Sequence, residues 1–177
     1  VIQLVNEGKA EKVDASVIEV YTHFARYYWY AKGNFQEALR HLDEAIRLCE
    51  AAAFNTDELK IPIYTNYGYT YGYSGDFDQS SRYFENALTL SIEIYGAESE
   101  QAADRYTDMV FPLIQKSEWE KAEIALKKAL ELNIRIRGAE HISVLKTYNN
   151  LGYIYLTKFD NDQAILYINK AMDLIRQ

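Results

Sequence analysis

The chain has 177 residues, a formal net charge of −7 and 49% hydrophobic residues. Nucleic-acid binding needs clustered Lys and Arg, so the acidic balance argues against a polynucleotide partner. Only 8 glycines and 2 prolines are present, which favours helices over a turn-rich β architecture.

Three further features concern location. Cys49 is the single cysteine, so no internal disulfide can form and a reducing, cytoplasmic compartment is expected. No apolar run approaches the ~20 residues that cross a bilayer, so no membrane association is expected. The sequence starts at Val1 without Met or a charged leader, which shows no signal peptide and favours a piece of a longer protein.

The dominant pattern is a repeat of 42 residues. Ala45, Ala87, Ala129 and Ala171 recur at this step, and so does a leucine three residues after each. A fixed period of this length is typical of repeat proteins that stack helical hairpins.

Residues 1–15 are interpreted as a connector and the end of a preceding helix, with Gly8 suited to a helix end. The first unit, 16–56, has an expected helix over Val17–Lys32 and a turn at Gly33-Asn34. Its second helix carries one apolar stripe, because its apolar residues are four, three and three apart. The stripe consists of Ala38, Leu42, Ala45 and Leu48.

The later units are expected at 57–98, 99–140 and 141–177. Pro112 falls inside the first helix of the third unit, which predicts a kink or a break there. Gly96 and Gly138 lie 42 apart between units, and each is expected to cap a helix with a positive φ.

The second and fourth units carry a family pattern. These units resemble the tetratricopeptide repeat, whose motif has a Leu-Gly pair, an aromatic three residues on, a small residue that opens the second helix and an alanine seven later. The residues are Gly68–Tyr71, Gly75–Phe77 and Ala87, then Leu151-Gly152, Tyr155, Ala164 and Ala171. The longer period, with Tyr148–Gly152 and Gly138–His141, resembles the repeats of kinesin light chains. The resemblance implies an all-α solenoid, a right-handed superhelix of about four antiparallel helix pairs.

The sequence departs from this pattern in places. Ala25-Arg26 and Met109-Val110 stand where the first and third units would have Leu-Gly. Phe159 stands in the glycine position of the fourth turn, so that turn is expected to differ.

The resemblance also implies a concave groove lined by the first helix of each unit. Two sets of groove residues repeat every 42 residues, one aromatic and one of Asn or Asp. The candidate peptide-binding residues are Tyr27, Asn66, Tyr69, Asp104, Asp108, Phe111, Lys146, Asn149, Asn150 and Tyr153.

Spaced Asn amides can hold the backbone of an extended peptide, and aromatic rings offer flat anchor surfaces. The alternative is that the aromatic set packs one first helix on the next. Asp104 and Asp108 would repel a terminal carboxylate and favour a neutral or basic ligand.

The predicted function is a non-catalytic scaffold that binds a peptide or protein segment in its groove. The alternatives are the peptide-sensing module of a bacterial regulator and a substrate-recruiting or regulatory region of a larger enzyme. His23, His41 and His141 form no metal-binding pair, and no catalytic residue, metal or cofactor is expected. End-to-end homodimerisation is a further alternative. The last helix carries Ile165, Tyr167, Met172 and Ile175 outside its inward stripe, where a terminal repeat normally has a polar face.

Overall fold

The computed structural model describes residues 13–176, and residues 1–12 and 177 lie outside the described range. The connector expected at the start of the chain, with Gly8, therefore lies almost entirely outside the described residues. The described part consists of helices and turns. The elements are α2 (Ala15–Arg26), the π-helix η1 (Tyr27–Lys32), α3 (Phe35–Ala51), α4 (Asp57–Ser74), α5 (Phe77–Tyr95), α6 (Glu100–Asp108), α7 (Val110–Gln115), α8 (Trp119–Arg137), α9 (Ile142–Thr157) and α10 (Asn161–Arg176).

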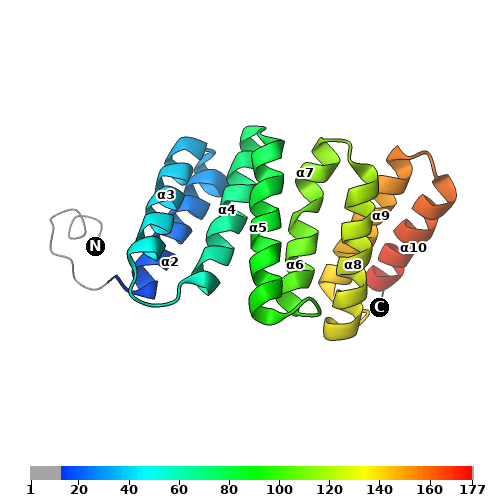
Figure 1. The fold of residues 1–177 in the computed structure, drawn as a ribbon. Helices are drawn as coiled ribbons and strands as arrows, with labels where there is room; N and C mark the ends of the chain where they lie inside the picture. Colours follow the sequence, from blue (N-terminus) through cyan, green and yellow to red (C-terminus); the bar gives the residue numbers. More distant parts are fainter. Residues whose placement is uncertain (1–12, 177) are drawn as a thin grey trace.

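The helices form hairpins that follow one another in a row from the N-terminal to the C-terminal end (Figure 1). Each pair has a first helix and a second helix: α2 and η1 with α3, α4 with α5, α6 and α7 with α8, and α9 with α10. The predicted all-α solenoid of about four repeats is confirmed.

The core follows the predicted stripes of the second helices. Ala38, Leu42, Ala45 and Leu48 are buried, and so are the later alanines of the 42-residue ladder. Small residues allow close approach between paired helices. At Gly68 an added Cβ would lie 2.7 Å from the ring of Phe84, so only glycine fits there without a shift of that ring.

The turn inside each pair uses a left-handed residue at one repeated position. Gly33 and Gly75 have φ of 61° and 94°, and Ser117 and Phe159 have φ of 58° and 59°. A side chain in this conformation is strained, because its Cβ crowds the backbone. The fourth turn therefore keeps the backbone of the others despite its phenylalanine.

Two sequence predictions about helix ends are confirmed. Gly96 and Gly138 cap α5 and α8 with φ of 89° and 90°. The first helix of the third pair breaks between α6 and α7, at Met109. The break lies where the ring of Pro112 would meet the carbonyl of Asp108, four residues earlier.

The first pair contains one extra residue. The N–H of Asn34 donates to the carbonyl of Tyr28, six residues back, at 2.9 Å. In the second pair the equivalent N–H of Asp76 donates to Tyr71, only five residues back, and the third and fourth pairs also span five. The π-helix η1 accommodates the insertion, as π turns commonly do.

Ring packing confirms the shift in register. Tyr21, Phe24 and Tyr28 surround the buried ring of His41. In the second pair the rings around Tyr83 belong to residues 64, 67 and 71, each 43 positions later. Residues of α2 therefore correspond to α4 at a step of 43, and Ala25 rather than Arg26 takes the position of Gly68.

Candidate peptide-binding groove

The first helices of the pairs form one face, which we call the groove face, and it carries two hollows of about 350 Å³ each. The N-terminal hollow lies between α2 and α4 and is lined by Ile18, Glu19, Thr22, His23, Arg26, Leu59, Pro62 and Asn66. The C-terminal hollow lies between α6 and α9 and is lined by Glu100, Asp104, Arg105, Thr107, Asp108, Arg137, His141, Ile142, Ser143 and Lys146.

Tyr69 and Asp108 join α4 to α6 between the two hollows. The Tyr69 hydroxyl donates to Oδ1 of Asp108 at 2.5 Å, and Nε of Arg105 lies 2.8 Å from Oδ2 of the same carboxylate. Burial raises the pKa of Tyr69 and that of Asp108, although Arg105 opposes both shifts. These two candidate residues are engaged in the joint between neighbouring pairs.

Asn66 is also engaged within the protein. Its Oδ1 accepts a hydrogen bond from Nε1 of Trp29 at 2.8 Å, and its Nδ2 donates to the carbonyl of Pro62 at 2.8 Å. The Trp29 ring in turn stacks on Tyr69 at 5.2 Å between centroids. The amide therefore connects the first helices of pairs one and two.

Phe111 packs between helices rather than standing in open groove. Its ring centroid lies 5.2 Å from that of Tyr73 and 6.3 Å from that of Phe77. An added Cβ at Gly72 would come within 2.8 Å of the Phe111 ring. For Tyr69 and Phe111 the structure thus has the packing arrangement that was the alternative to ligand contact.

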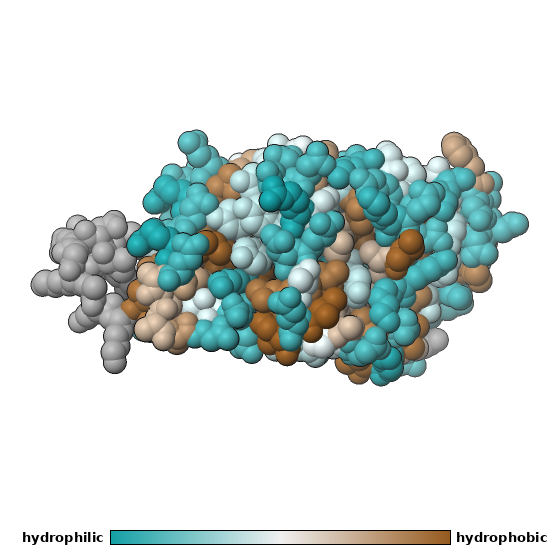
Figure 2. Space-filling model, in the orientation of Figure 1, coloured by the Kyte–Doolittle hydropathy of each residue, from teal (hydrophilic) through white to brown (hydrophobic). Residues whose placement is uncertain are grey.

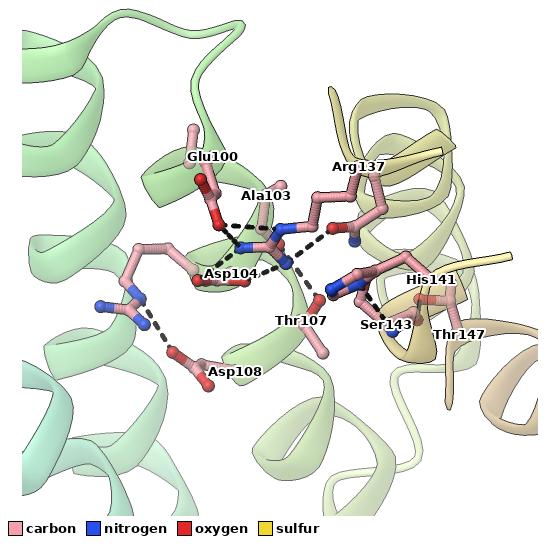
Figure 3. A network of polar contacts seen from close by, with 12 residues as sticks. Glu100, Ala103, Asp104, Thr107, Asp108, Arg137, His141, Ser143 and Thr147 are labelled. Carbon is pink, nitrogen blue, oxygen red and sulfur yellow. Dashed lines mark hydrogen bonds and ion pairs between the residues drawn. The ribbon is translucent and has the colours of Figure 1, made fainter. Parts of the chain in front are cut away.

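Arg137 pairs with two of the acids of the C-terminal hollow. Its Nη1 lies 2.8 Å from Asp104 and 2.8 Å from Oδ1 of Asn133, and its Nη2 lies 2.6 Å from Glu100 (Figure 3). Its side chain is only 13% exposed. Asp104 is paired with Arg137 and Asp108 with Arg105, and these contacts weaken the electrostatic basis of the expected preference for a neutral or basic ligand.

Tyr27 does not hold the repeated groove position. With the step of 43, Arg26 corresponds to Tyr69 and His23 to Asn66, and both line the N-terminal hollow. Tyr27 is exposed but lies in η1, beyond the residues that line this hollow. The turn residues Gly33 and Gly75 are 42 residues apart, so the sequence pattern places Tyr27 in the aromatic set. The extra residue lies before Gly33, so the residues that precede it correspond to the second pair at a step of 43 instead.

Four candidates on α9 have side chains turned to solvent or only half buried: Lys146, Asn149, Asn150 and Tyr153. Within residues 13–176 none of their side chains makes a hydrogen bond or an ion pair. Lys146 lines the C-terminal hollow directly. This part of the groove face has polar groups and an aromatic ring that are available to a ligand.

Sequence reasoning did not identify Arg26, Glu100 or Arg137 as groove residues. The sequence does contain a signal for Arg26. Ala25 is small, as Gly68 is, and aligning these two residues places Arg26 at the position of Tyr69. Arg137 carries no comparable signal. It is the last residue of α8, and its reach to α6 depends on how the two helices pack.

Two other searches of the described residues were negative. No group of His, Cys, Asp and Glu within 13–176 has the arrangement of a metal site. Among the helices of the same range, none combines the length and apolar character needed to cross a bilayer.

Sequence comparison decides the family. Three family models, each described as a tetratricopeptide repeat, match residues 17–53, 61–91 and 113–177. The chain belongs to the tetratricopeptide repeat family. Tetratricopeptide repeat folds are in general scaffolds for protein–protein interaction, and typically non-catalytic. No curated protein sequence matches this tetratricopeptide repeat chain.

Solved structures agree on the fold. BtubC (BKLC) from P. vanneervenii superimposes with a TM-score of 0.74 at 23% identity, over 90% of this chain and 71% of that one. A putative kinesin light chain from P. anserina, with nearly identical TPR-like repeats, gives a TM-score of 0.59 at 12% identity, over 91% and 96%. At these identities the superpositions establish the tetratricopeptide fold alone.

Proposed function

We propose that the chain binds an extended segment of a partner protein along the groove face, with α9 as the principal contact helix. The observation that carries the proposal is the set of available side chains at Lys146, Asn149, Asn150 and Tyr153 beside the C-terminal hollow. Amides that donate and accept can hold a peptide backbone without reading its sequence. An exposed tyrosine is a low-entropy anchor for a ligand side chain.

The charges around α9 indicate the character of the ligand. Asp104 and Glu100 are held by Arg137, whereas Lys146 has no ion-pair partner among residues 13–176. We therefore infer a segment that is neutral along most of its length and presents an acidic or carbonyl group to Lys146. From the sequence alone, Asp104 and Asp108 favour a neutral or basic ligand, and the proposed segment keeps only the neutral part of that expectation.

We further propose that the chain acts without catalysis and in the cytoplasm. The buried thiol of Cys49 supports the first point, because burial raises its pKa and a raised pKa disfavours the reactive thiolate. The second point rests on the single cysteine.

A pooled display of unstructured peptides tests the proposed groove. The wild type is compared with an Asn150→Ala/Tyr153→Ala variant, and affinities of enriched peptides are measured by fluorescence anisotropy. We expect a roughly 10- to 100-fold loss of affinity, since each side chain contributes about 1 kcal/mol or more to such an interface.

Ile124→Ala is the matched control, because Ile124 is exposed on α8 and lines neither hollow. The control should bind like the wild type. Equal enrichment of the same peptides on wild type and the double variant would refute the groove, and so would the absence of any enriched peptide.

A further inference from the structure

The second and fourth pairs carry the same cluster of three tyrosine rings. The tyrosine cluster of the second pair consists of Tyr64, Tyr71 and Tyr83, and that of the fourth pair of Tyr148, Tyr155 and Tyr167. The first and last rings of a cluster are tilted, with centroids 6.1 Å apart at 42° in the second pair and 6.0 Å apart at 40° in the fourth. The middle and last rings stack with centroids 5.5 Å apart in both pairs. The two clusters therefore have the same geometry.

In the fourth pair, a lysine of the protein itself occupies the cluster. Nζ of Lys170 lies 5.6 Å from the ring centroid of Tyr148 and 5.2 Å from that of Tyr167. An ammonium over a ring at such a distance is attracted by the negative face of the π-system. In the third pair the last ring is absent, and Lys128, at the position of Lys170, pairs with Glu98 at 3.2 Å instead. The lysine thus lies over the rings in the pair that has both of them.

The cluster of the second pair holds no such cation. Asn86 stands at the position of Lys170 and is exposed. Among residues 13–176, no lysine or arginine lies over the rings of Tyr64, Tyr71 or Tyr83. All three rings are only half-buried, so part of each is open to solvent. The second pair therefore leaves open the place that an ammonium fills in the fourth.

The charge beside the cluster also differs between the two pairs. The preceding second helix carries Asp43 beside the second pair, and Lys127 at the same position beside the fourth. The carboxylate of Asp43 accepts a hydrogen bond from the Tyr67 hydroxyl at 2.5 Å. Burial raises the pKa of Tyr71, and the charge of Asp43 raises it further. Asp43 is exposed and has no ion-pair partner within residues 13–176, so a negative charge beside the open rings is unpaired.

The nearby basic groups leave this negative charge in excess. Burial, and after it Tyr71 and Asp43, raise the pKa of Tyr83, and Arg82 opposes them with a smaller effect than that of Asp43. Lys60, one turn before the first ring, is held in an ion pair at 2.8 Å. The cluster of the second pair thus combines open aromatic rings with a carboxylate, which together attract a cation.

We propose that the tyrosine cluster of the second pair binds a lysine side chain of a partner protein, with its ammonium between Tyr64 and Tyr83 and beside Asp43. The contact would repeat the one that Lys170 makes within the fourth pair. Clusters of aromatic rings also bind methylated lysine, so the partner's lysine can carry methyl groups, whereas acetylation would remove the charge that the rings recognise.

This site is separate from the groove face. Residues of an α-helix follow one another at about 100°, so Tyr64 and Tyr71 lie on the opposite side of α4 from Asn66, which lines the N-terminal hollow. The inference does not depend on the proposed groove function.

Nuclear magnetic resonance titration with lysine peptides tests the site. The probe is an unstructured Gly-Ser peptide with one central lysine, added in unmodified, trimethylated or acetylated form to protein with isotope-labelled tyrosine rings. Because a single cation–π site binds weakly, peptide is added up to millimolar concentrations. The trimethylated peptide, alone or together with the unmodified one, should shift the ring signals of Tyr64 and Tyr83, and the acetylated peptide should not. No shift with either charged peptide, or equal shifts with the acetylated one, would overturn the proposal.

Asn86→Lys supplies a competitor from within the chain. Position 86 is exposed on α5, so the variant should fold, and its ammonium should occupy the cluster as Lys170 does in the fourth pair. Peptide binding should fall about tenfold or more. Thr89→Lys, which adds the same charge at an exposed position one turn further along α5, is the matched control and should bind like the wild type. Unchanged binding by Asn86→Lys would overturn the assignment of the site.

A pair of ring deletions separates the two clusters. Tyr83→Leu should weaken peptide binding about tenfold, whereas Tyr167→Leu, in the cluster that already holds Lys170, should leave it unchanged. Asp43→Asn keeps an acceptor for the Tyr67 hydroxyl but loses the charge, and it should weaken binding several-fold. Circular dichroism checks that each variant is folded. Loss of binding in Tyr167→Leu but not in Tyr83→Leu would place the peptide on the fourth pair and contradict the proposal.

Discussion

At the scale of single residues, the turn position has one backbone conformation in all four pairs but three different residue types: glycine, serine and phenylalanine. Gly33 and Gly75 adopt the left-handed region without cost, whereas Ser117 and Phe159 adopt it with a Cβ. Phe159 is 89% exposed, so its side chain does not stabilise the turn by burial. The packed helices on either side keep the turn in this strained conformation.

Phe159→Gly should therefore stabilise the protein by about 1 kcal/mol. The relieved left-handed strain of about 1–2 kcal/mol exceeds the entropy that glycine adds to the unfolded chain. The free energy of unfolding, from urea titration followed by circular dichroism, measures this. Ser117→Gly should act in the same direction, and a loss of stability in both variants would contradict the argument.

The two ladder asparagines should respond differently to the same substitution. Asn66→Ala removes the acceptor of the Trp29 indole N–H and should lower the free energy of unfolding by about 1–2 kcal/mol. Asn150→Ala, whose amide has no partner within residues 13–176, should change it by less than about 0.5 kcal/mol. Thermal melts of the two variants side by side test this. Equal destabilisation would place both amides in structural roles.

At the scale of elements, the register of each first helix is set by its contact with its own second helix. In the first pair the rings around His41 hold Tyr21, Phe24 and Tyr28 in place, and burial together with Arg40 lowers the pKa of His41. The extra residue then has to be absorbed between Tyr28 and Gly33. A π turn does this at the end of the helix without disturbing the packed part.

Deletion of Tyr30 should consequently be tolerated. Tyr30 is exposed in η1, and its removal would convert the π turn into the shorter form found in the other pairs. Deletion of Tyr73, at the equivalent place in α4, should unfold the second pair, because every residue before it would rotate by about 100° relative to its partners. Circular dichroism and melting temperature distinguish the two, and equal damage would contradict the insertion.

The joint between α8 and α9 should make stability depend on pH. Burial by itself raises the pKa of Glu123, but hydrogen bonds from Lys127, Lys158 and Tyr155 outweigh it and lower the pKa to about 2. A carboxylate with a lowered folded-state pKa stabilises the fold above its ordinary pKa of 4.5, and this contribution is lost as pH falls toward 2.

Glu123→Gln should therefore lower the free energy of unfolding by about 2 kcal/mol at pH 7, with a shrinking difference from wild type between pH 4.5 and 2. Urea titrations at several pH values measure it. Glu120→Gln, an exposed acid one turn earlier, is the control and should show little pH-dependent effect. A difference that stays constant down to pH 2 would contradict the assignment.

At the scale of the whole molecule, the solenoid has two unlike ends and a long outer surface. The side shown in Figure 2 is mostly hydrophilic, with hydrophobic residues in separate patches. In a stack, each internal pair is stabilised by two neighbours and each end pair by one. Stability should therefore be highest in the middle of the row.

Hydrogen exchange followed by mass spectrometry should show this gradient. Amides of α4, α5 and α6 should exchange more slowly than those of α2 and α10, because end pairs open locally at lower free energy. Equal exchange rates along the whole row would contradict the gradient.

The sequence alone determined the fold of this protein, because a helical stripe repeated at a constant step can be buried only by stacking like units. It also determined the helix break before Pro112 and the glycine caps, since these follow from local backbone chemistry. The use of each groove side chain was decided by tertiary structure. Asn66 and Asn150 hold the same position of the 42-residue repeat, so the sequence does not distinguish them. In the structure Trp29 donates a hydrogen bond to Asn66, whereas Asn150 faces solvent and is available to a ligand. The inserted residue in η1 and the reach of Arg137 to Asp104 likewise depend on how one helix packs on another, which no single segment of sequence specifies.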